Sequence, residues 1–159
     1  AVLGADFCHP MLTPAAEKIG RARLRSTLFE ADGLTLPLAG DSLDAITIAF
    51  GFRNFANYQK GLEEMLRVLK PGGVAAILEF SQPKNAVFAR LYDWFSAVLL
   101  PRIGGLISGS RAAYTYLPES IRKFPNAELL AERMREAGFR TVEYELMTFG
   151  AVALHIGRK

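Results

Sequence analysis

The sequence predicts one compact α/β domain built around a largely parallel sheet. Strand-like and helix-like runs alternate along the chain, which is the pattern of a parallel sheet covered by helices. The central strand-like runs are continuously apolar, and 159 residues suit a single domain. Because no repeat, low-complexity tract or linker divides the chain, we expect one domain over residues 1–159.

The first half of the chain contains three expected strands and one helix. Val2–Asp6 is a short apolar run that ends in an acid, and Thr27–Ala31 is a second short strand. Between them, Pro10–Gly20 is expected to be a helix, with Met11, Ala15 and Ile19 on its inward face. Ala45–Phe50 (AITIAF) lacks any polar alternation, so we expect a strand buried on both faces.

The second half repeats this alternation and then ends differently. A helix is expected at Tyr58–Leu69, where KPGG stops it, followed by a buried strand at Val74–Phe80. Phe88–Ile107 is a long apolar helix-like stretch and Ser108–Pro125 is irregular, before a short helix at Asn126–Ala137. The remaining residues, 140–159, are expected to form two strands joined near Gly150, an antiparallel hairpin at the sheet edge.

Composition excludes several classes of protein. The 19 Lys and Arg are scattered and exceed the 16 Asp and Glu by only three, so we expect no nucleic-acid partner. A single cysteine, Cys8, excludes an internal disulfide and fits a reducing cytoplasm; we expect it to be a small core residue. No group of residues has metal-ligand spacing, so no metal site is expected.

Five motifs occur in a fixed order: FGFRNF, RVLKPGG, LEFS, YLPESIRKFP and GAVALHIGRK. Together they resemble the UbiE/COQ5/MenG family, the C-methyltransferases of ubiquinone and menaquinone biosynthesis, over essentially the whole chain. The resemblance implies the class I S-adenosylmethionine-dependent methyltransferase fold, with a Rossmann-like sheet. It also implies S-adenosylmethionine as cofactor and C-methylation of a polyprenyl quinol as the reaction.

The chain departs from this family at its start. Family members have a first strand and a glycine-rich turn that cradles the cofactor, and no G-x-G-x-G run occurs here. We therefore expect a sheet truncated before its second strand. The gap is closed by direct pairing of its neighbours, filled by another chain such as a second copy, or supplied by a complementing N-terminal segment.

Four residues are expected to bind the cofactor. Asp6 ends the first strand of this chain, where an acid can accept hydrogen bonds from both ribose hydroxyls; the alternative is an acid that caps or turns into the next helix. By resemblance, Asp32 or the Gly33 backbone meets the adenine, and the alternative is an ordinary Asp-Gly turn. Ala49 would face the cofactor through its backbone, again by resemblance.

The resemblance assigns the catalytic role to Arg53 and Asn54, which follow the strand at Ala45–Phe50. A ring carbon ortho to a hydroxyl becomes nucleophilic when that hydroxyl loses its proton. Arg stays protonated at ordinary pH, so Arg53 is expected to stabilise the phenolate, and Asn54 to hold Arg53 or the cofactor. Without the resemblance, Arg53 is equally a surface or ion-pairing residue. Glu79 either shapes the pocket or pairs with a nearby Arg, and His155 is placed on an edge strand.

The segment around 86–125 is open to two interpretations. It is a helix packed on the domain, or a lid-like insertion that admits a prenylated quinol from the inner membrane surface, lined by Tyr114, Tyr116 and Arg122. We accordingly expect a cytoplasmic protein, peripheral to the inner membrane surface if the second interpretation holds. Two other functions stay open: a truncated, non-catalytic homologue that serves as a partner-binding module, and a methyltransferase for another small molecule.

Overall fold

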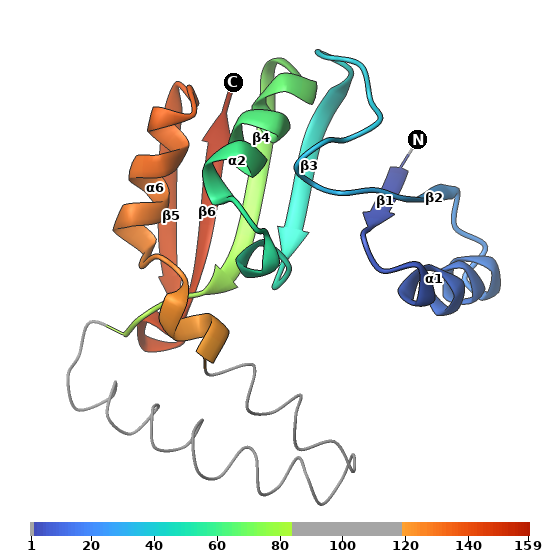
Figure 1. Ribbon diagram of the computed structural model, residues 1–159, viewed down its shortest axis with the longest axis horizontal. Helices are drawn as coiled ribbons and strands as arrows, with labels where there is room; N and C mark the ends of the chain where they lie inside the picture. Colours follow the sequence, from blue (N-terminus) through green and yellow to red (C-terminus); the bar gives the residue numbers. More distant parts are fainter. Residues whose placement is uncertain (1, 84–118) are drawn as a thin grey trace, which may run out of the picture.

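A computed structural model describes residues 2–83 and 119–159 of the chain (Figure 1). Its elements in chain order are β1 (Val2–Asp6), α1 (His9–Arg21), β2 (Ser26–Glu30), β3 (Leu43–Ala49), the 3-10 turn η1 (Phe52–Asn54), α2 (Tyr58–Val68), β4 (Leu69–Phe80), α6 (Ala127–Glu136), β5 (Thr141–Met147), the 3-10 turn η3 (Thr148–Gly150) and β6 (Val152–Arg158). The expected lid-like insertion, with Tyr114 and Tyr116, lies mostly outside the described residues. Residues 119–123 are helical, where an irregular segment was expected.

The described strands form two separate sheets. β1 and β2 pair in parallel, and β3, β4, β6 and β5 form a second sheet in that spatial order. β3 and β4 are parallel, whereas β6 is antiparallel to both β4 and β5. The expected parallel sheet with a C-terminal antiparallel hairpin is therefore confirmed. The alternative in which neighbouring strands close the gap directly is wrong, because β1 and β3 do not pair.

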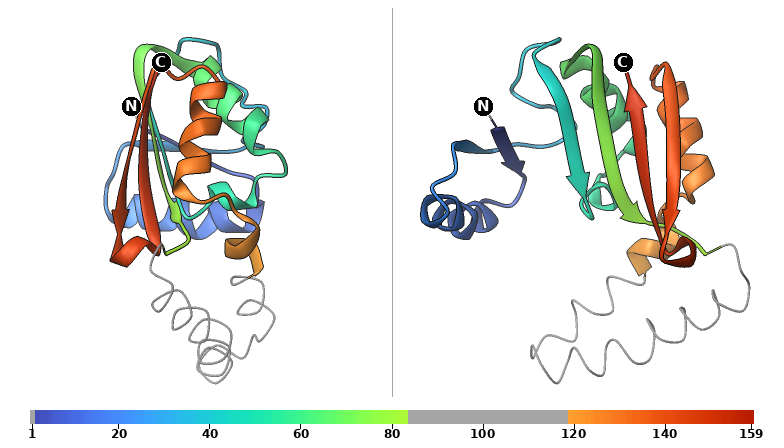
Figure 2. Two further views of the ribbon diagram at one scale, coloured as in Figure 1. Left: turned by 90° about the vertical axis from the view of Figure 1, so that its left-hand side faces the viewer. Right: turned by 180° about the vertical axis from the view of Figure 1, so that it is seen from behind.

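The core lies between one face of the four-stranded sheet and the helices α2 and α6, which cover that face together (Figure 2). Its buried apolar residues are Phe52, Leu62, Met65, Leu69, Ala75, Ile77, Phe124, Leu130, Met134 and Phe139. Phe52 is central: its ring packs against the rings of Phe55, Tyr58 and Phe124. The helical spacing of apolar residues in α2 and α6 is explained by this shared surface.

β3 is not buried on both faces, which corrects the expectation for Ala45–Phe50. Ile46 and Ile48 pack toward the core, whereas Ala45, Thr47 and Ala49 alternate with them and are exposed. The strand has a continuous apolar sequence because its outward residues are mostly small alanines. A run of this kind does not distinguish one covered face from two.

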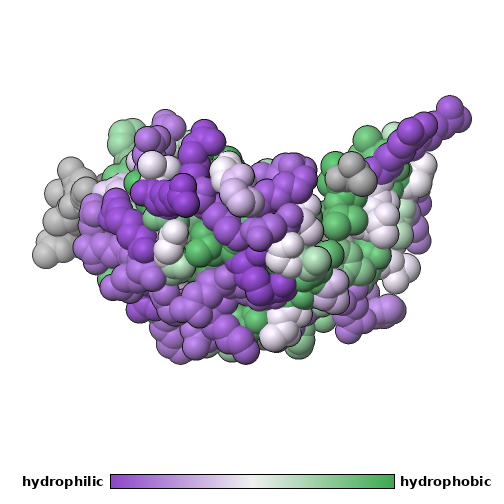
Figure 3. All heavy atoms as spheres, turned by 90° about the horizontal axis from the view of Figure 1, so that it is seen from above, coloured by the Kyte–Doolittle hydropathy of each residue, from purple (hydrophilic) through white to green (hydrophobic). Residues whose placement is uncertain are grey.

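The N-terminal elements have no buried core of their own. α1 packs mainly on β1 and β2 and has no buried residue, so Met11, expected to face inward, is 57% exposed. Cys8 is likewise exposed and is not a core residue. Seen from above, apolar side chains gather at the end of the molecule that carries β1 and β2 (Figure 3). The exposed large apolar side chains there include Val2, Leu3 and Phe7.

No helix within residues 2–83 and 119–159 has the length and apolar character needed to cross a membrane.

Candidate active site

The predicted site residues follow the carboxyl ends of the parallel strands. β1, β3 and β4 end on the same side of the molecule (Figure 1), and β2 runs parallel to β1. Asp6 is the last residue of β1, and Ala49 is the last residue of β3. Ligands of open α/β sheets bind outside the carboxyl ends of the strands, so this side is the candidate site.

Asp6 is exposed and shapes the turn that follows β1. Its Oδ1 accepts a hydrogen bond from the Cys8 N–H at 2.8 Å, and its carbonyl accepts one from the Ala31 N–H at 3.1 Å. The N-cap of α1 is Cys8, and no side chain among the described residues caps this helix, so of the two structural alternatives for Asp6 the turn acid is confirmed and the helix cap is wrong. Within the described part of the chain, the second carboxylate oxygen of Asp6 has no hydrogen-bond partner.

Asp32 and Gly33 form a tight turn after β2. The Asp32 Oδ1 accepts from the Leu34 N–H at 2.9 Å, and the Asp32 carbonyl accepts from the Thr35 N–H at 3.0 Å. A Cβ on Gly33 would lie 2.3 Å from Cζ of Phe55, so only glycine permits this approach. The Asp32–Gly33 turn thus packs directly on the ring of Phe55, the residue that follows Arg53 and Asn54 in the sequence.

The chain reverses sharply after β3. Phe50 has φ of 55°, a left-handed conformation that is uncommon and costly for a bulky residue. Its N–H donates to the Leu78 carbonyl at 2.9 Å, and its ring packs on Phe80 with the centroids 4.9 Å apart. These contacts hold the strained residue and direct the chain from Ala49 into η1. Backbone strain of this kind clusters at functional sites.

Arg53 is held in place by Glu79, the penultimate residue of β4. Its Nη1 lies 3.0 and 3.2 Å from the two carboxylate oxygens, and the two side chains are 11% and 1% exposed. Nη1 also donates to the Phe50 carbonyl, and the guanidinium lies over the Phe80 ring. Glu79 is therefore the ion-pairing partner that was one of its two alternatives. Among residues 2–83 and 119–159, the buried Nε of Arg53 has no hydrogen-bond partner.

Asn54 and Tyr58 complete this turn. The Asn54 N–H donates to the Gly51 carbonyl at 3.1 Å, and Asn54 itself is exposed. The Tyr58 hydroxyl donates to the Arg53 carbonyl at 3.1 Å, which ties η1 to the start of α2. Arg122, expected to line the lid, is exposed.

The two histidines lie in different surroundings. His155 is on the internal strand β6, so its placement on an edge strand is wrong. It is buried under α6, where its Nε2 lies 2.8 Å from the Ala127 carbonyl, and burial lowers its pKa. His9 is exposed, and its Nδ1 lies 2.8 Å from Glu30. Over the described residues, no three His, Cys, Asp or Glu side chains gather as they would around a metal ion.

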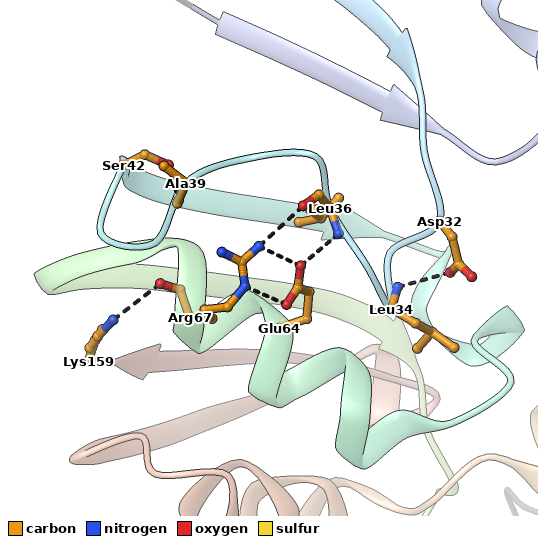
Figure 4. Close-up of polar contacts among 8 residues, drawn as sticks. All are labelled: Asp32, Leu34, Leu36, Ala39, Ser42, Glu64, Arg67 and Lys159. Carbon is orange, nitrogen blue, oxygen red and sulfur yellow. Dashed lines mark hydrogen bonds and ion pairs between the residues drawn. The ribbon is translucent and has the colours of Figure 1, made fainter.

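Sequence reasoning missed an ion pair on α2 that contacts the loop after β2 (Figure 4). Glu64 accepts from the Leu36 N–H at 2.6 Å, and Arg67 donates to the Leu36 carbonyl at 3.2 Å. The two side chains bind each other through two contacts of 2.7 Å. Their i, i+3 spacing is the signal for an ion pair. Nothing in that spacing reveals a loop 28 residues earlier.

A model of the ubiE/COQ5 methyltransferase family matches residues 1–159. A demethylmenaquinone methyltransferase from Thermus thermophilus is 50% identical over 156 residues, covering 98% of this chain and 70% of the relative. One from Deinococcus radiodurans is 48% identical over 158 residues, covering 99% and 65%. The UbiE C-methyltransferase of Syntrophotalea carbinolica is 47% identical over 156 residues, covering 98% and 65%. The chain thus spans about two thirds of the length of these relatives.

Solved structures share the fold at low sequence identity. The [4+2]-cyclase SpnF has a TM-score of 0.73 at 18% identity, with 99% of this chain and 66% of that one covered. A SAM-dependent methyltransferase from Aquifex aeolicus has a TM-score of 0.65 at 20% identity, with 99% and 67% covered. These likenesses confirm the class I methyltransferase architecture. A cyclase among them illustrates that the fold alone does not specify the reaction.

Proposed function

Because the chain belongs to the ubiE/COQ5 methyltransferase family, we propose that it takes part in the S-adenosylmethionine-dependent C-methylation of a polyprenyl quinol, with demethylmenaquinol as the substrate. The observation that carries this proposal is the family match over residues 1–159. The relatives at 50% and 48% identity are both named demethylmenaquinone methyltransferase, which favours a naphthoquinol over a benzoquinol.

The described residues fit the nucleoside part of the cofactor. Ribose hydroxyls and the adenine amino group are hydrogen-bond donors, so their site needs acceptors. Asp6 and Asp32 are exposed carboxylates after neighbouring parallel strands, and each uses Oδ1 within its own turn. We propose that the remaining oxygen of each accepts a hydrogen bond from the nucleoside. The backbone of Ala49 ends the adjoining sheet on the same side.

Arg53 is the residue proposed to assist the reaction itself. When bound, S-adenosylmethionine supplies an electrophilic methyl group. The quinol carbon that accepts this methyl becomes nucleophilic when the neighbouring hydroxyl is ionised, so a fixed positive charge favours the reactive phenolate. The ion pair with Glu79 holds the guanidinium of Arg53 at the end of β4. The proposed role therefore depends on a guanidinium with a fixed orientation. Asn54, next to Arg53 in η1, is proposed to contact the cofactor or the quinol.

The first test is titration of S-adenosylmethionine into this chain by calorimetry, followed by transfer of a labelled methyl group to demethylmenaquinol. We expect Asp6→Ala to weaken cofactor binding by about tenfold or more, because it removes hydrogen bonds to a charged acceptor. The control is Glu17→Ala, which removes an exposed carboxylate from α1. Cofactor binding without methyl transfer to any quinol would contradict the substrate proposal. Absence of cofactor binding would favour the non-catalytic, partner-binding alternative.

A further inference from the structure

The loop from Ala31 to Ser42 joins the two sheets and begins with the Asp32–Gly33 turn. Leu36 lies near its middle, and both polar groups of the Leu36 backbone are bound by side chains of α2 (Figure 4). The N–H donates to Glu64 and the carbonyl accepts from Arg67. A loop residue held at both of its backbone groups cannot rotate without breaking two hydrogen bonds.

The contact is strong because its two side chains support each other. Arg67 binds both carboxylate oxygens of Glu64, through Nε and Nη2, in the fork geometry that favours arginine. The Glu64 side chain is only 12% exposed, and its hydrogen bond with Arg67 lowers its pKa. Glu64 is therefore ionised at neutral pH and accepts a charge-assisted hydrogen bond from Leu36.

The two ends of the loop are held as well. At its start, the Phe55 ring lies between Gly33 and Gly61, where added Cβ atoms would come within 2.3 and 2.5 Å of it. At its end, the N–H groups of Asp41 and Ser42 donate to carbonyls in the last turn of α2 at 3.0 and 2.9 Å. The loop is thus held against α2 at its start, middle and end. Of these contacts, the one at Leu36 is made by charged side chains, and it lies three residues from the Asp32–Gly33 turn.

We propose that Glu64 and Arg67 are positioning residues for the adenine end of the cofactor, acting through Leu36 on the Asp32–Gly33 turn. This inference rests on the proposed function, in which Asp32 or the Gly33 backbone accepts from the adenine amino group. Acceptors that are fixed before the base arrives need not be ordered on binding, which strengthens their hydrogen bonds to the base that matches them. The ion pair supplies that preorganisation from a helix that does not itself touch the base.

The test compares two ligands that differ only at the base. S-adenosylhomocysteine has the adenine amino group, whereas S-inosylhomocysteine has a carbonyl oxygen there. We expect Glu64→Gln and Arg67→Met to weaken S-adenosylhomocysteine binding by about tenfold and S-inosylhomocysteine binding much less, so that selectivity between the two falls. Arg67→Lys keeps the charge without the fork and should retain part of the selectivity. Asp44→Asn, which breaks the exposed Lys70–Asp44 pair, is the matched control and should change neither affinity.

Amide exchange without ligand provides a second, independent measurement. Exchange of the Leu36 N–H should accelerate in Glu64→Gln and Arg67→Met and stay unchanged in Asp44→Asn. Faster exchange with unaltered selectivity would overturn the positioning role, because the ion pair would then only stabilise the loop. A uniform loss of affinity for both ligands would overturn it too. If the unsubstituted chain binds neither ligand, the proposed function fails, and this inference fails with it.

Discussion

At the scale of single residues, the Arg53–Glu79 pair links the candidate chemistry to the stability of the chain. The Glu79 carboxylate accepts from the Arg53 guanidinium, from the Arg53 N–H and from the Phe80 N–H. Two of these donors belong to Arg53 in η1, the turn that follows β3, and the third belongs to the last residue of β4. One buried carboxylate therefore organises the end of two strands and the turn between them.

Replacement of Glu79 by Gln should be strongly destabilising. The substitution leaves the Arg53 charge largely buried without its counter-charge, and breaking a buried pair in this way costs about 3 kcal/mol. Urea unfolding measures the loss. Glu143→Gln, on the exposed face of the edge strand β5, is the control and should leave the free energy of unfolding nearly unchanged. If the Glu79→Gln chain is as stable as the unsubstituted chain, the negative charge of Glu79 is not what holds Arg53 in place.

His155 makes stability depend on pH. Burial lowers the pKa of His155 in the folded chain below the ordinary value of 6.5, whereas the unfolded chain titrates near that value. As the pH falls below about 6.5, the unfolded state takes up the proton first, so the folded state loses stability at up to about 1.4 kcal/mol per pH unit. Above that pH the two states bind equal numbers of protons here, and the effect disappears.

Urea unfolding between pH 7.5 and 5 tests this dependence. His155→Gln should lose less stability on acidification than the unsubstituted chain, although it is less stable at pH 7.5. His9→Gln is the control, because His9 is exposed and its loss should leave the acid sensitivity in place. If His155→Gln and the unsubstituted chain lose stability in parallel, protonation of His155 is not the cause.

At the scale of elements, α2 is the best-supported helix described. Asn57 caps its start, where the side chain accepts from the Lys60 N–H at 3.0 Å. Lys159 caps its end: Nζ donates to the carbonyls of Leu66 and Leu69 at 2.8 and 2.7 Å and contacts Asp41 at 2.7 Å. A lysine at a helix C-terminus satisfies carbonyls that have no partner within the helix and interacts favourably with the helix dipole.

Lys159→Met should therefore lower the free energy of unfolding by about 1 to 2 kcal/mol, because it leaves the last carbonyls of α2 without their donor. Thermal and urea unfolding both report this change. Lys70→Met is the matched control at the same end of the helix, since the partner of Lys70 within the described residues is the highly exposed Asp44. If the two substitutions cost the same, Lys159 acts as an ordinary surface charge.

Elements whose apolar residues all meet one surface were predictable from the sequence. The spacing in Tyr58–Leu69 predicted α2 to within one residue. KPGG follows the end of α2, but it lies within β4, which begins at Leu69 and not at the expected Val74. α1 shows the same apolar spacing, yet among the described elements it packs mainly on β1 and β2, and Met11 stays exposed. Periodicity predicts that a helix has an apolar face. It does not predict whether the described chain contains enough neighbours to cover that face.

The candidate site divides in the same way. Asp6 was predictable because it ends a strand, and the direction of parallel strands brings such ends to one side, whereas Asp32 and Ala49 were expected only from the family resemblance. The Leu36 contacts of Glu64 and Arg67 were not predictable, because they depend on how a loop without regular structure folds back on a helix. The roles of all these residues in cofactor binding are proposals, which the binding measurements with S-adenosylmethionine and S-adenosylhomocysteine test.

At the scale of the whole molecule, the chain has a well-packed part and a loosely packed part. None of residues 2–30 is buried, so β1, α1 and β2 have no core, whereas β4, β6, α2 and α6 surround the main one. The two parts are joined through the loop that α2 holds at Leu36, Asp41 and Ser42. Stability should accordingly differ between them, because local opening is governed by the apolar contacts that it breaks.

Native-state hydrogen exchange should therefore show two levels of protection. We expect the hydrogen-bonded amides of β1 and β2 to exchange at least about tenfold faster than those of β4 and β6, through local opening that leaves the main core intact.

S-adenosylhomocysteine at a hundred times its Kd should then raise protection in β1 and β2 by up to about 2.7 kcal/mol, because opening there would disrupt the proposed contacts of Asp6 and Asp32. Homocysteine, which lacks the adenosine group, is the control ligand and should not change the amide protection of either sheet. Equal protection of both sheets without ligand would mean that the chain unfolds as one unit despite its unequal packing. Unequal protection that S-adenosylhomocysteine does not alter would place the cofactor away from β1 and β2.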